Sequence, residues 1–420
     1  MLQPGAAGLK AHSARGLKPR SARATVGAPM SDWDPLLERL ADAPRENGSA
    51  ALHQTASFLA ETLERAGLDV ASIEFDAQPF VLRLAGVLAL AGGLLYWRWL
   101  RAGRAGAALA VAVAVPLLLL AQLEWQLPVF GWVGAEPQTH VLALRPAAAP
   151  DQRLILAAHY DTKTDALDHV ERAPVDQLAL PVIPLMLAGA LAALWAGRRP
   201  RRPRAVAWLV ALAAWSAAAY GIATFAALSA GAFIPARSPG ALDDGGACAV
   251  LVRVGEELAR RPELARTQVE LLLLSAEEVG VQGSWAYAAQ RFAAPPDLPT
   301  FVINLEGIGA SSEFAVLGRE RFTLRAYAPD ARVLALLDAT HRASLGAPLA
   351  VTSFGGSTDA RSFLAHGIPA ATLVSAEPGR LVPRGLHSSA DSRARLDESA
   401  LDASVAYLLD VIARADAKGI

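Results

Sequence analysis

The chain contains a single cysteine, Cys248, among its 420 residues. One cysteine excludes a disulfide within the chain and a zinc site built from several cysteines, and it leaves the redox compartment open. Charged residues are also scarce, at 19%, and they nearly cancel to a net charge of −1. This balance gives no reason to expect nucleic acid as a partner. Hydrophobic residues make up 53% of the chain, and this high share predicts membrane segments.

The first 29 residues lack the apolar run that a secretory signal needs, and they are rich in Ala, Gly, Arg and Lys. Met30 then opens Met-Ser-Asp-Trp-Asp-Pro-Leu-Leu-Glu-Arg-Leu, a stretch with the pattern of a capped helix. We expect residues 1–29 to be a disordered basic tail or a consequence of the choice of start site. A basic transit peptide is the alternative account.

Two pairs of long apolar segments interrupt the soluble pattern. Residues 81–97 and 105–123 flank a loop with three arginines, and residues 178–196 and 205–230 flank a loop with five. Segments of this length predict about four transmembrane helices, in hairpins at 80–125 and 177–233. Pairs of buried core helices are the alternative. Arg83, near the start of the first segment, must reach the membrane interface.

The arginine-rich loops predict how the chain is oriented in a membrane. Such loops stay in the cytoplasm, so we expect the soluble segments to be extracytoplasmic in an integral protein of the plasma or inner membrane. The N-terminal stretch then has to cross without a cleavable signal. The spans hold almost no ionisable residues besides Arg83, which argues against a transporter.

The remaining segments alternate between strand and helix patterns. Such alternation predicts an α/β fold with a mostly parallel central sheet and helices on both faces. We assign residues 30–79, 138–176 and 237–420 to one domain that the two hairpins interrupt. The expected strands are 68–75, 139–144, 153–159, 268–274, 301–305 and 370–374, and the expected helices are 50–66, 247–260, 331–345 and 398–414.

Polar residues follow the predicted strands, at the edge where an open α/β sheet builds its site. Each motif alone is weak, because Asp-Asp-Gly-Gly is commonly a turn or helix cap and a lone His-x-Asp is commonly a surface pair. Together they supply imidazoles and carboxylates, the ligands that zinc favours, in a site without cysteine that suits catalysis. The residues are His159, Asp161, Asp243, Asp244, Glu277, Glu278, Asn304, Glu306 and His387.

The order of these motifs resembles the M28 family of co-catalytic zinc aminopeptidases. The order is His-x-Asp at 159–161, Gly-Ala-x-Asp-x-Gly at 240–245, Glu-Glu-x-Gly-x-x-Gly-Ser at 277–284, Asn-Leu-Glu at 304–306 and a late histidine at 387. Ser-Thr-Asp-Ala-Arg-Ser-Phe-Leu-Ala-His-Gly-Ile-Pro, at 357–369, is similar to that family's loop before its last core strand. In the family the stretch between the first two motifs is short, whereas here it holds an expected hairpin.

The resemblance implies two bound Zn²⁺ ions, or other divalent metals, in a membrane-anchored metallopeptidase domain. It implies that His159 and Glu306 bind one ion, that Glu278 and His387 bind the other, and that Asp243 bridges them. The family more often has Asp at the position of Glu306, although the longer carboxylate can still reach a metal.

The resemblance also implies roles around the ligands. Glu277 would be the general base, and Asp161 would orient His159 through its second ring nitrogen. Asp359 would support the ligands or contact the substrate, with a plain loop role as the alternative. We expect Asp244 to cap a helix or to support the ligands, and Cys248 to be a small packed residue.

A peptide is the implied substrate, with N-terminal residues removed by hydrolysis. Acyl transfer like that of glutaminyl cyclases, which use one zinc on a similar fold, is an alternative. A non-enzymatic membrane scaffold or receptor is another. The complete ligand set and Glu277 favour hydrolysis, whereas no pattern indicates the side-chain preference or the oligomeric state.

Overall fold

The computed structural model describes residues 32–199, 203–352, 356–375 and 383–420. The predicted basic tail, residues 1–29, lies outside these described residues. The elements named below all belong to one unit of the chain, Trp33–Ile420.

A sheet of eight strands forms the centre of the soluble part, in the order β1-β2-β4-β3-β5-β10-β6-β9. Its four middle strands, β4, β3, β5 and β10, run parallel. The pairs β1–β2, β2–β4 and β10–β6 are antiparallel, so the mostly parallel sheet that the sequence predicts is confirmed. The strands are β1 (Asp69–Ala77), β2 (Glu136–Arg145), β3 (Gln152–His159), β4 (Thr267–Leu274), β5 (Thr300–Glu306), β6 (Phe314–Val316), β9 (Ala350–Val351) and β10 (Ala370–Ser375).

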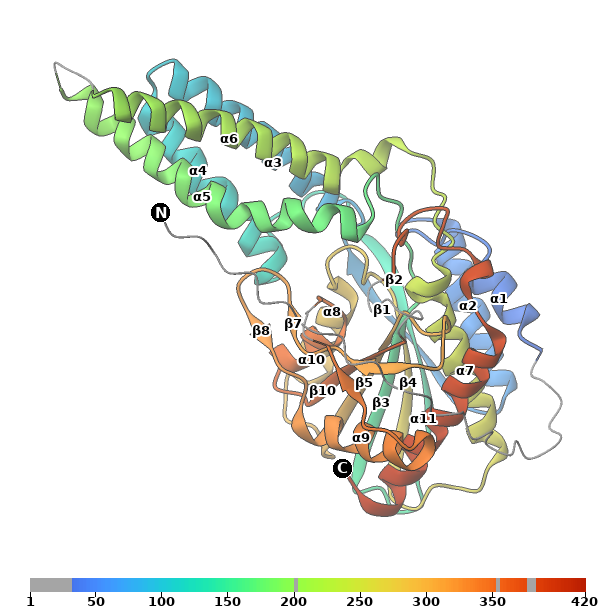
Figure 1. Cartoon of the computed structure of the whole chain (residues 1–420). Coiled ribbons are helices and arrows are strands. Elements are labelled where there is room, and N and C mark those ends of the chain that lie inside the picture. The colour runs from blue at the N-terminus through green and yellow to red at the C-terminus, as the bar shows by residue number, and fades with distance from the viewer. Residues whose placement is uncertain (1–31, 200–202, 353–355, 376–382) are drawn as a thin grey trace, which may run out of the picture. The chain divides into compact units, whose positions relative to one another are not determined.

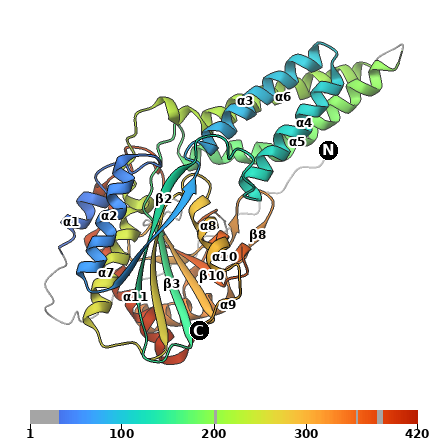
Figure 2. The same cartoon turned by 180° about the vertical axis from the view of Figure 1, so that it is seen from behind.

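Helices cover both faces of this sheet, as Figures 1 and 2 show. Strand side chains alternate between the faces, so Leu154 and Leu156 of β3 enter one core cluster while Ile155 and Ala157 enter another. Every residue of β3 is buried, as expected of a central parallel strand. The first cluster includes α1 (Asp34–Leu40), α2 (Ala50–Arg65), α7 (Gly246–Arg260), α9 (Ala331–Leu345) and α11 (Glu398–Lys418), and the second includes α8 (Gln282–Arg291) and α10 (Ala360–Ala365).

The elements that the sequence did not predict are short. The helices α8 and α10 and the strands β6 and β9 were missed, together with the small hairpin of β7 (Glu320–Arg321) and β8 (Ala326–Tyr327). A strand of two or three residues shows no alternation of polar and apolar side chains, so its pattern cannot be recognised.

Among the described residues, four helices are long and apolar enough to cross a membrane. They are α3 (Val81–Arg101), α4 (Ala105–Leu119) continued by the π-helical turn η1 (Leu120–Glu124), α5 (His169–Gly197) and α6 (Arg204–Leu228). We call α3 with α4 the first hairpin and α5 with α6 the second hairpin. All four contribute to one apolar cluster, visible in Figure 1 as a helical bundle.

The start of the second hairpin differs from the prediction, because α5 begins at His169 and not at residue 177. Asp168 caps the helix by accepting a hydrogen bond from Glu171 N, and Glu171 bonds back to Asp168 N. The first turns of α5 are polar, so a search for apolar residues could not include them.

Small residues let the helices of the bundle approach closely. A Cβ atom on Gly93 of α3 would overlap the main-chain oxygen of Ala217 in α6, and one on Gly221 would lie 2.7 Å from Ala89 O. Close contact of this kind is how apolar helices associate in lipid. Large apolar side chains point outward instead, and Trp208, Leu212 and Trp215 of α6 are 74%, 58% and 59% exposed.

We predict that Gly93→Leu loosens the bundle, because its side chain has no space between α3 and α6. The change should destabilise the protein by about 1–3 kcal/mol, measured as a lower unfolding temperature in detergent. Gly106→Leu in α4 is the matched control, since a Cβ there meets nothing within 4 Å. Equal unfolding temperatures for the two variants would contradict the close contact.

Candidate metal centre

Three strand ends supply side chains to one site. His159 is the last residue of β3, Glu306 is the last residue of β5, and Glu277 and Glu278 lie in the turn that follows β4. Because β4, β3 and β5 are adjacent and parallel, their carboxyl ends meet at the same edge of the sheet. The predicted residues from these strands are therefore brought together.

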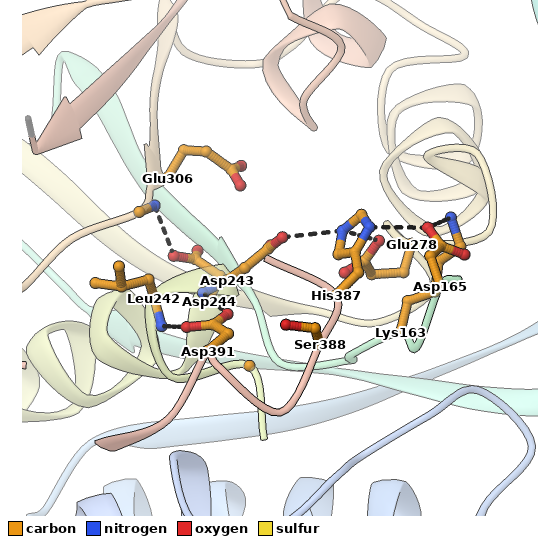
Figure 3. A network of polar contacts seen from close by, with 12 residues as sticks. Lys163, Asp165, Leu242, Asp243, Asp244, Glu278, Glu306, His387, Ser388 and Asp391 are labelled. Atoms are coloured by element: carbon orange, nitrogen blue, oxygen red, sulfur yellow. Dashed lines mark hydrogen bonds and ion pairs between the residues drawn. The ribbon is translucent and has the colours of Figure 1, made fainter. Parts of the chain in front are cut away.

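Two further side chains reach the site from loops, as Figure 3 shows. Asp243 lies in the turn η3 (Ala241–Gly245) that leads into α7, and His387 lies in the segment between β10 and α11. Gly240, at the start of that turn, has a φ of 61°, and a Cβ there would meet Thr162 and the carbonyl of Asp243. Glycine is thus required for the turn that presents Asp243.

Asp243 lies between the two histidines. Its Oδ1 is 3.2 Å from His159 Nε2 and its Oδ2 is 3.1 Å from His387 Nε2. Glu306 Oε1 is 3.7 Å from His159 Nε2, and Glu278 Oε2 is 3.1 Å from His387 Nε2. The result is two groups of three possible metal ligands, with Asp243 common to both.

These residues fit a pair of divalent cations. Ligand atoms about 2.0–2.2 Å from a tetrahedral zinc ion lie about 3.3–3.6 Å from one another, close to the histidine–carboxylate separations of 3.1–3.7 Å in the two groups. Glu278 Oε1 and Glu306 Oε2 are buried and have no hydrogen-bond partner among the described residues. Buried oxygens of this kind need a counter-charge, which a cation would provide.

The electrostatics of the ligands are consistent with this interpretation. Burial alone would lower the pKa of His159, but Asp161, Asp243 and Glu306 raise it well above the ordinary value. Burial would likewise raise the pKa of Asp243, yet His159 and His387 hold it well below its usual range. Burial raises the pKa of Glu306, with Asp243 and Glu278 adding repulsion. Positive charge at this edge is therefore favourable.

Glu277 and Glu278 differ in their surroundings although they are neighbours in sequence. Glu278 is 6% exposed and faces His387, whereas Glu277 is partly exposed. Burial, followed by repulsion from Glu278 and Asp359, raises the pKa of Glu277 well above its ordinary value. Asp359, fully buried just before α10, has its pKa raised to about 7, mainly by burial.

Asp161 contacts the second ring nitrogen of His159 and also binds the turn that follows β4. Its main-chain oxygen, 3.1 Å from His159 Nδ1, is closer to that nitrogen than its own carboxylate at 3.5 Å. The carboxylate also accepts the N–H groups of Glu277 and Glu278, at 3.2 and 3.0 Å, and the amide of Asn47 at 2.7 Å. One side chain therefore links the ends of β3 and β4.

Two carboxylates that the sequence reasoning missed support the ligands. Asp165 Oδ2 lies 2.9 Å from His387 Nδ1. Asp391 accepts hydrogen bonds from Leu242 N and Asp243 N, at 2.8 and 3.2 Å. Asp391 lies only a few residues after His387 in Gly-Leu-His-Ser-Ser-Ala-Asp, so proximity was a usable signal; nothing in the sequence marks Asp165.

Of the two expectations for Asp244, a helix cap or support for the ligands, the first is wrong, because α7 begins at Gly246 and Gly245 is its capping residue. Asp244 Oδ1 accepts the N–H of Gly307 at 3.1 Å and so lies beside the end of β5. Cys248 is fully buried in the main core cluster, which confirms it as a small packed residue.

Arg45 connects the residue after His159 to the segment that leads to Asp243. It is 1% exposed, and its guanidinium donates to the main-chain oxygens of Tyr160, Pro239 and Gly240, at 2.8, 2.7 and 3.2 Å. Burial lowers the pKa of Arg45 to about 10, so the side chain stays charged at neutral pH. A buried arginine with main-chain partners gives no sequence pattern, and the sequence reasoning missed it.

Comparison with known proteins gives one family match. Residues 225–412 match the model of peptidase family M28. Asp243, Glu278, Glu306 and His387 lie within this range, whereas His159 precedes it. No curated protein matches the sequence.

Several solved structures share the fold. Glutaminyl cyclase from Fimbriiglobus ruber matches 94% of this chain and 99% of its own, at 13% identity and a TM-score of 0.52. A Zn-dependent exopeptidase from Parabacteroides distasonis matches 90% of this chain and 96% of its own, at 13% identity and a TM-score of 0.51. Glutaminyl cyclase from Tannerella forsythia matches 90% and 95%, at 14% identity and a TM-score of 0.51. At identities this low, the similarity of the structures shows a shared fold alone.

We predict that Arg45→Met destabilises the protein by about 3 kcal/mol or more, because several buried main-chain oxygens lose a charged donor. Urea unfolding in detergent measures the change. Arg342→Met, which breaks an exposed pair with Asp338 on α9, is the control and should cost less than about 1 kcal/mol. Similar midpoints for the two variants would show that Arg45 does not hold the loops together.

Proposed function

Because residues 225–412 of this chain match the model of peptidase family M28, we propose that the protein is a membrane-bound zinc metallopeptidase that removes N-terminal residues from peptides. One observation carries the proposal. The two oxygens of Asp243 face different histidines, at 3.2 and 3.1 Å, and each pair is joined by one glutamate. A carboxylate in this position suits a bridge between two metal ions.

The ligand sets follow from these two groups. His159, Asp243 and Glu306 would hold one zinc ion, and Asp243, Glu278 and His387 would hold the other. Two such ions, when bound, acidify a water molecule and polarise the carbonyl of the bond to be cut. The three protein ligands in each group leave room for water and substrate, as in catalytic zinc sites.

Glu277 is the proposed general base. Its main-chain N–H is fixed by Asp161, and its partly exposed position separates it from the buried ligand Glu278. Nearby divalent cations would favour its ionised form, opposing the burial and repulsion that raise its pKa. Its carboxylate can then take a proton from water and deliver it to the nitrogen of the leaving amine.

The surplus of carboxylates supports a substrate with a positively charged end. Asp244, Glu277 and Asp359 remain after the proposed ligands are assigned, and burial raises the pKa of each, so a nearby positive charge is needed to favour the ionised form. A free amino terminus offers the complementary charge. We assign Asp359 to supporting the ligands or contacting the substrate, and Asp161 to positioning His159 and the turn of Glu277.

Glutaminyl cyclisation is the second candidate, since two structures that share the fold are named glutaminyl cyclases. That reaction closes an N-terminal glutamine onto its own amine and releases ammonia without cutting the peptide bond. The two candidates therefore differ in product. A peptide that begins with glutamine would be shortened by the peptidase and would keep its length with the cyclase.

The membrane assignment rests on the two hairpins. Their four helices are long and apolar enough to span a bilayer, and the described arginines of the connecting loops are exposed. We propose that these loops lie in the cytoplasm and that the peptidase domain, residues 30–79, 138–176 and 237–420, lies on the other side. The exposed arginines that the structure describes at this end of the hairpins are Arg98 and Arg101 in the last turn of α3, Arg104, Arg198 and Arg199 in the connecting segments, and Arg204 at the start of α6.

We predict that Glu277→Ala lowers kcat by about 100- to 10,000-fold, because the water loses its proton acceptor. The zinc content should stay as in the wild type, since Glu277 is not a proposed ligand. The assay follows release of amino acids from free and N-terminally blocked peptides, including one that begins with glutamine, with metal analysis of the same samples.

Glu263→Ala, an exposed glutamate in the loop before β4, is the control for this experiment. Undiminished hydrolysis by Glu277→Ala would refute the proposed base. Hydrolysis of blocked peptides as fast as free ones would refute aminopeptidase action, and conversion of the glutamine peptide without shortening would establish the second candidate.

We predict that a periplasmic phosphatase, a reporter that is active only outside the cytoplasm, will be active when it is fused after Ile420. The reason is that an even number of spans separates the C-terminus from the start of the first hairpin. A reporter in the loop between α3 and α4 should give the opposite result. Activity of a cytoplasm-specific reporter at Ile420 would reverse the proposed orientation.

A further inference from the structure

We infer that Asp165 is a positioning residue for the proposed zinc ligand His387, and that the first turn of the apolar helix α5 holds Asp165 in place. The inference deepens the proposed function and rests on it, because it concerns one ligand of the second metal group. It gives the second hairpin a part in building the metal centre, in addition to anchoring the chain.

Asp165 holds His387 through both its side chain and its main chain. Its Oδ2 lies 2.9 Å from His387 Nδ1, and its N–H donates to the carbonyl of His387 at 3.0 Å. The opposite ring nitrogen, Nε2, then faces Asp243 and Glu278, each at 3.1 Å. A carboxylate on one imidazole nitrogen fixes the tautomer and orientation in which the other nitrogen binds metal.

His387 needs such support because of its backbone. Its φ is 61°, in the left-handed region that costs free energy for residues other than glycine. The surrounding contacts must therefore keep it there. Asp165 supplies two of them from a segment more than two hundred positions earlier in the sequence.

Asp165 is in turn held by two cations. Lys163 Nζ and Arg172 Nη1 lie 2.8 and 2.9 Å from the same Oδ2 atom that faces His387. Asp165 is 3% exposed, so these charges interact with little screening by water. Figure 3 shows Lys163 and Asp165 beside His387.

Arg172 belongs to the first turn of α5, and a second bond joins this turn to the same loop. Asp168 caps α5 with its Oδ1 and accepts the N–H of Gly385 with its Oδ2, at 2.9 Å. Gly385 lies two residues before His387. The start of α5 thus contacts the His387 loop through Gly385 and supports His387 itself through Asp165.

The other end of the second hairpin packs on the same segment. After α6, Gly231 lies so close to Thr164 and Asp165 that a Cβ would overlap Thr164 O and lie 3.0 Å from Asp165 Cα. Segments before α5 and after α6 therefore meet at Thr164 and Asp165. The position of His387 therefore depends on how the two ends of the second hairpin pack against Thr164 and Asp165.

Zinc titration of the full chain in detergent, after removal of metal with a chelator, tests the inference. Asp165→Asn should lower the affinity for one of the two zinc ions by about 10- to 100-fold and change the affinity for the other much less. Arg172→Met should lower the affinity for the same ion by a smaller factor. Arg172→Lys should keep most of that affinity, because lysine retains the positive charge. Arg342→Met on α9 is the control and should leave both affinities unchanged.

The inference is overturned if folded Asp165→Asn binds both zinc ions with the affinities of the wild type, or if the substitution lowers both affinities equally. Circular dichroism and cooperative unfolding establish that the variant is folded. If Asp165→Asn does not fold, Arg172→Met decides, and unchanged zinc affinity in that variant overturns the inference. A wild-type chain that binds no zinc refutes the proposed function itself, and the inference falls with it.

Discussion

The crowding of buried carboxylates at one edge of the sheet is the constraint on which the other features of the site depend. Asp243, Asp244, Glu278 and Glu306 lie close to two histidines, with Glu277 and Asp359 adding further negative charge. Like charges out of water are costly unless cations or hydrogen bonds compensate them. The strands, the glycine at position 240 and the supporting hydrogen bonds all act against that cost, because each fixes a carboxylate where a cation can be shared.

The compensation is arranged in layers around the ligands. Main-chain N–H groups bind the carboxylates of Asp161 and Asp391, which lie behind His159 and Asp243. Positively charged side chains lie further from the centre of the cluster. Arg45 lies behind His159, and Lys163 and Arg172 lie near His387. None of these three cations is paired with a proposed metal ligand in the described contacts. The centre of the cluster is thus left to the proposed metal ions, and the protein's own positive charge serves to hold the loops.

The sequence was informative wherever a local pattern existed. Apolar runs revealed the middle strands, and Glu277 and Glu278 were found because they follow the buried leucines of β4. Contacts between distant loops could not be found this way. Arg45 reaches Gly240, Asp165 reaches His387, and the polar start of α5 carries no hydropathy signal, so each depends on the folded arrangement. The residues that gather at this edge of the sheet were thus predictable, whereas the residues that position them were not.

The position of the apolar helices in the chain sets the order in which the metal centre can be completed during synthesis. His159 is made after the first hairpin and before the second, while Asp243, Glu278, Glu306 and His387 all follow the second. Neither three-residue group is complete until α3 to α6 have left the ribosome. A nascent chain whose hairpins are still being made therefore cannot hold the ion pair. Binding of the proposed metal ions, and with it the proposed hydrolytic activity, would come only after the synthesis of the four apolar helices.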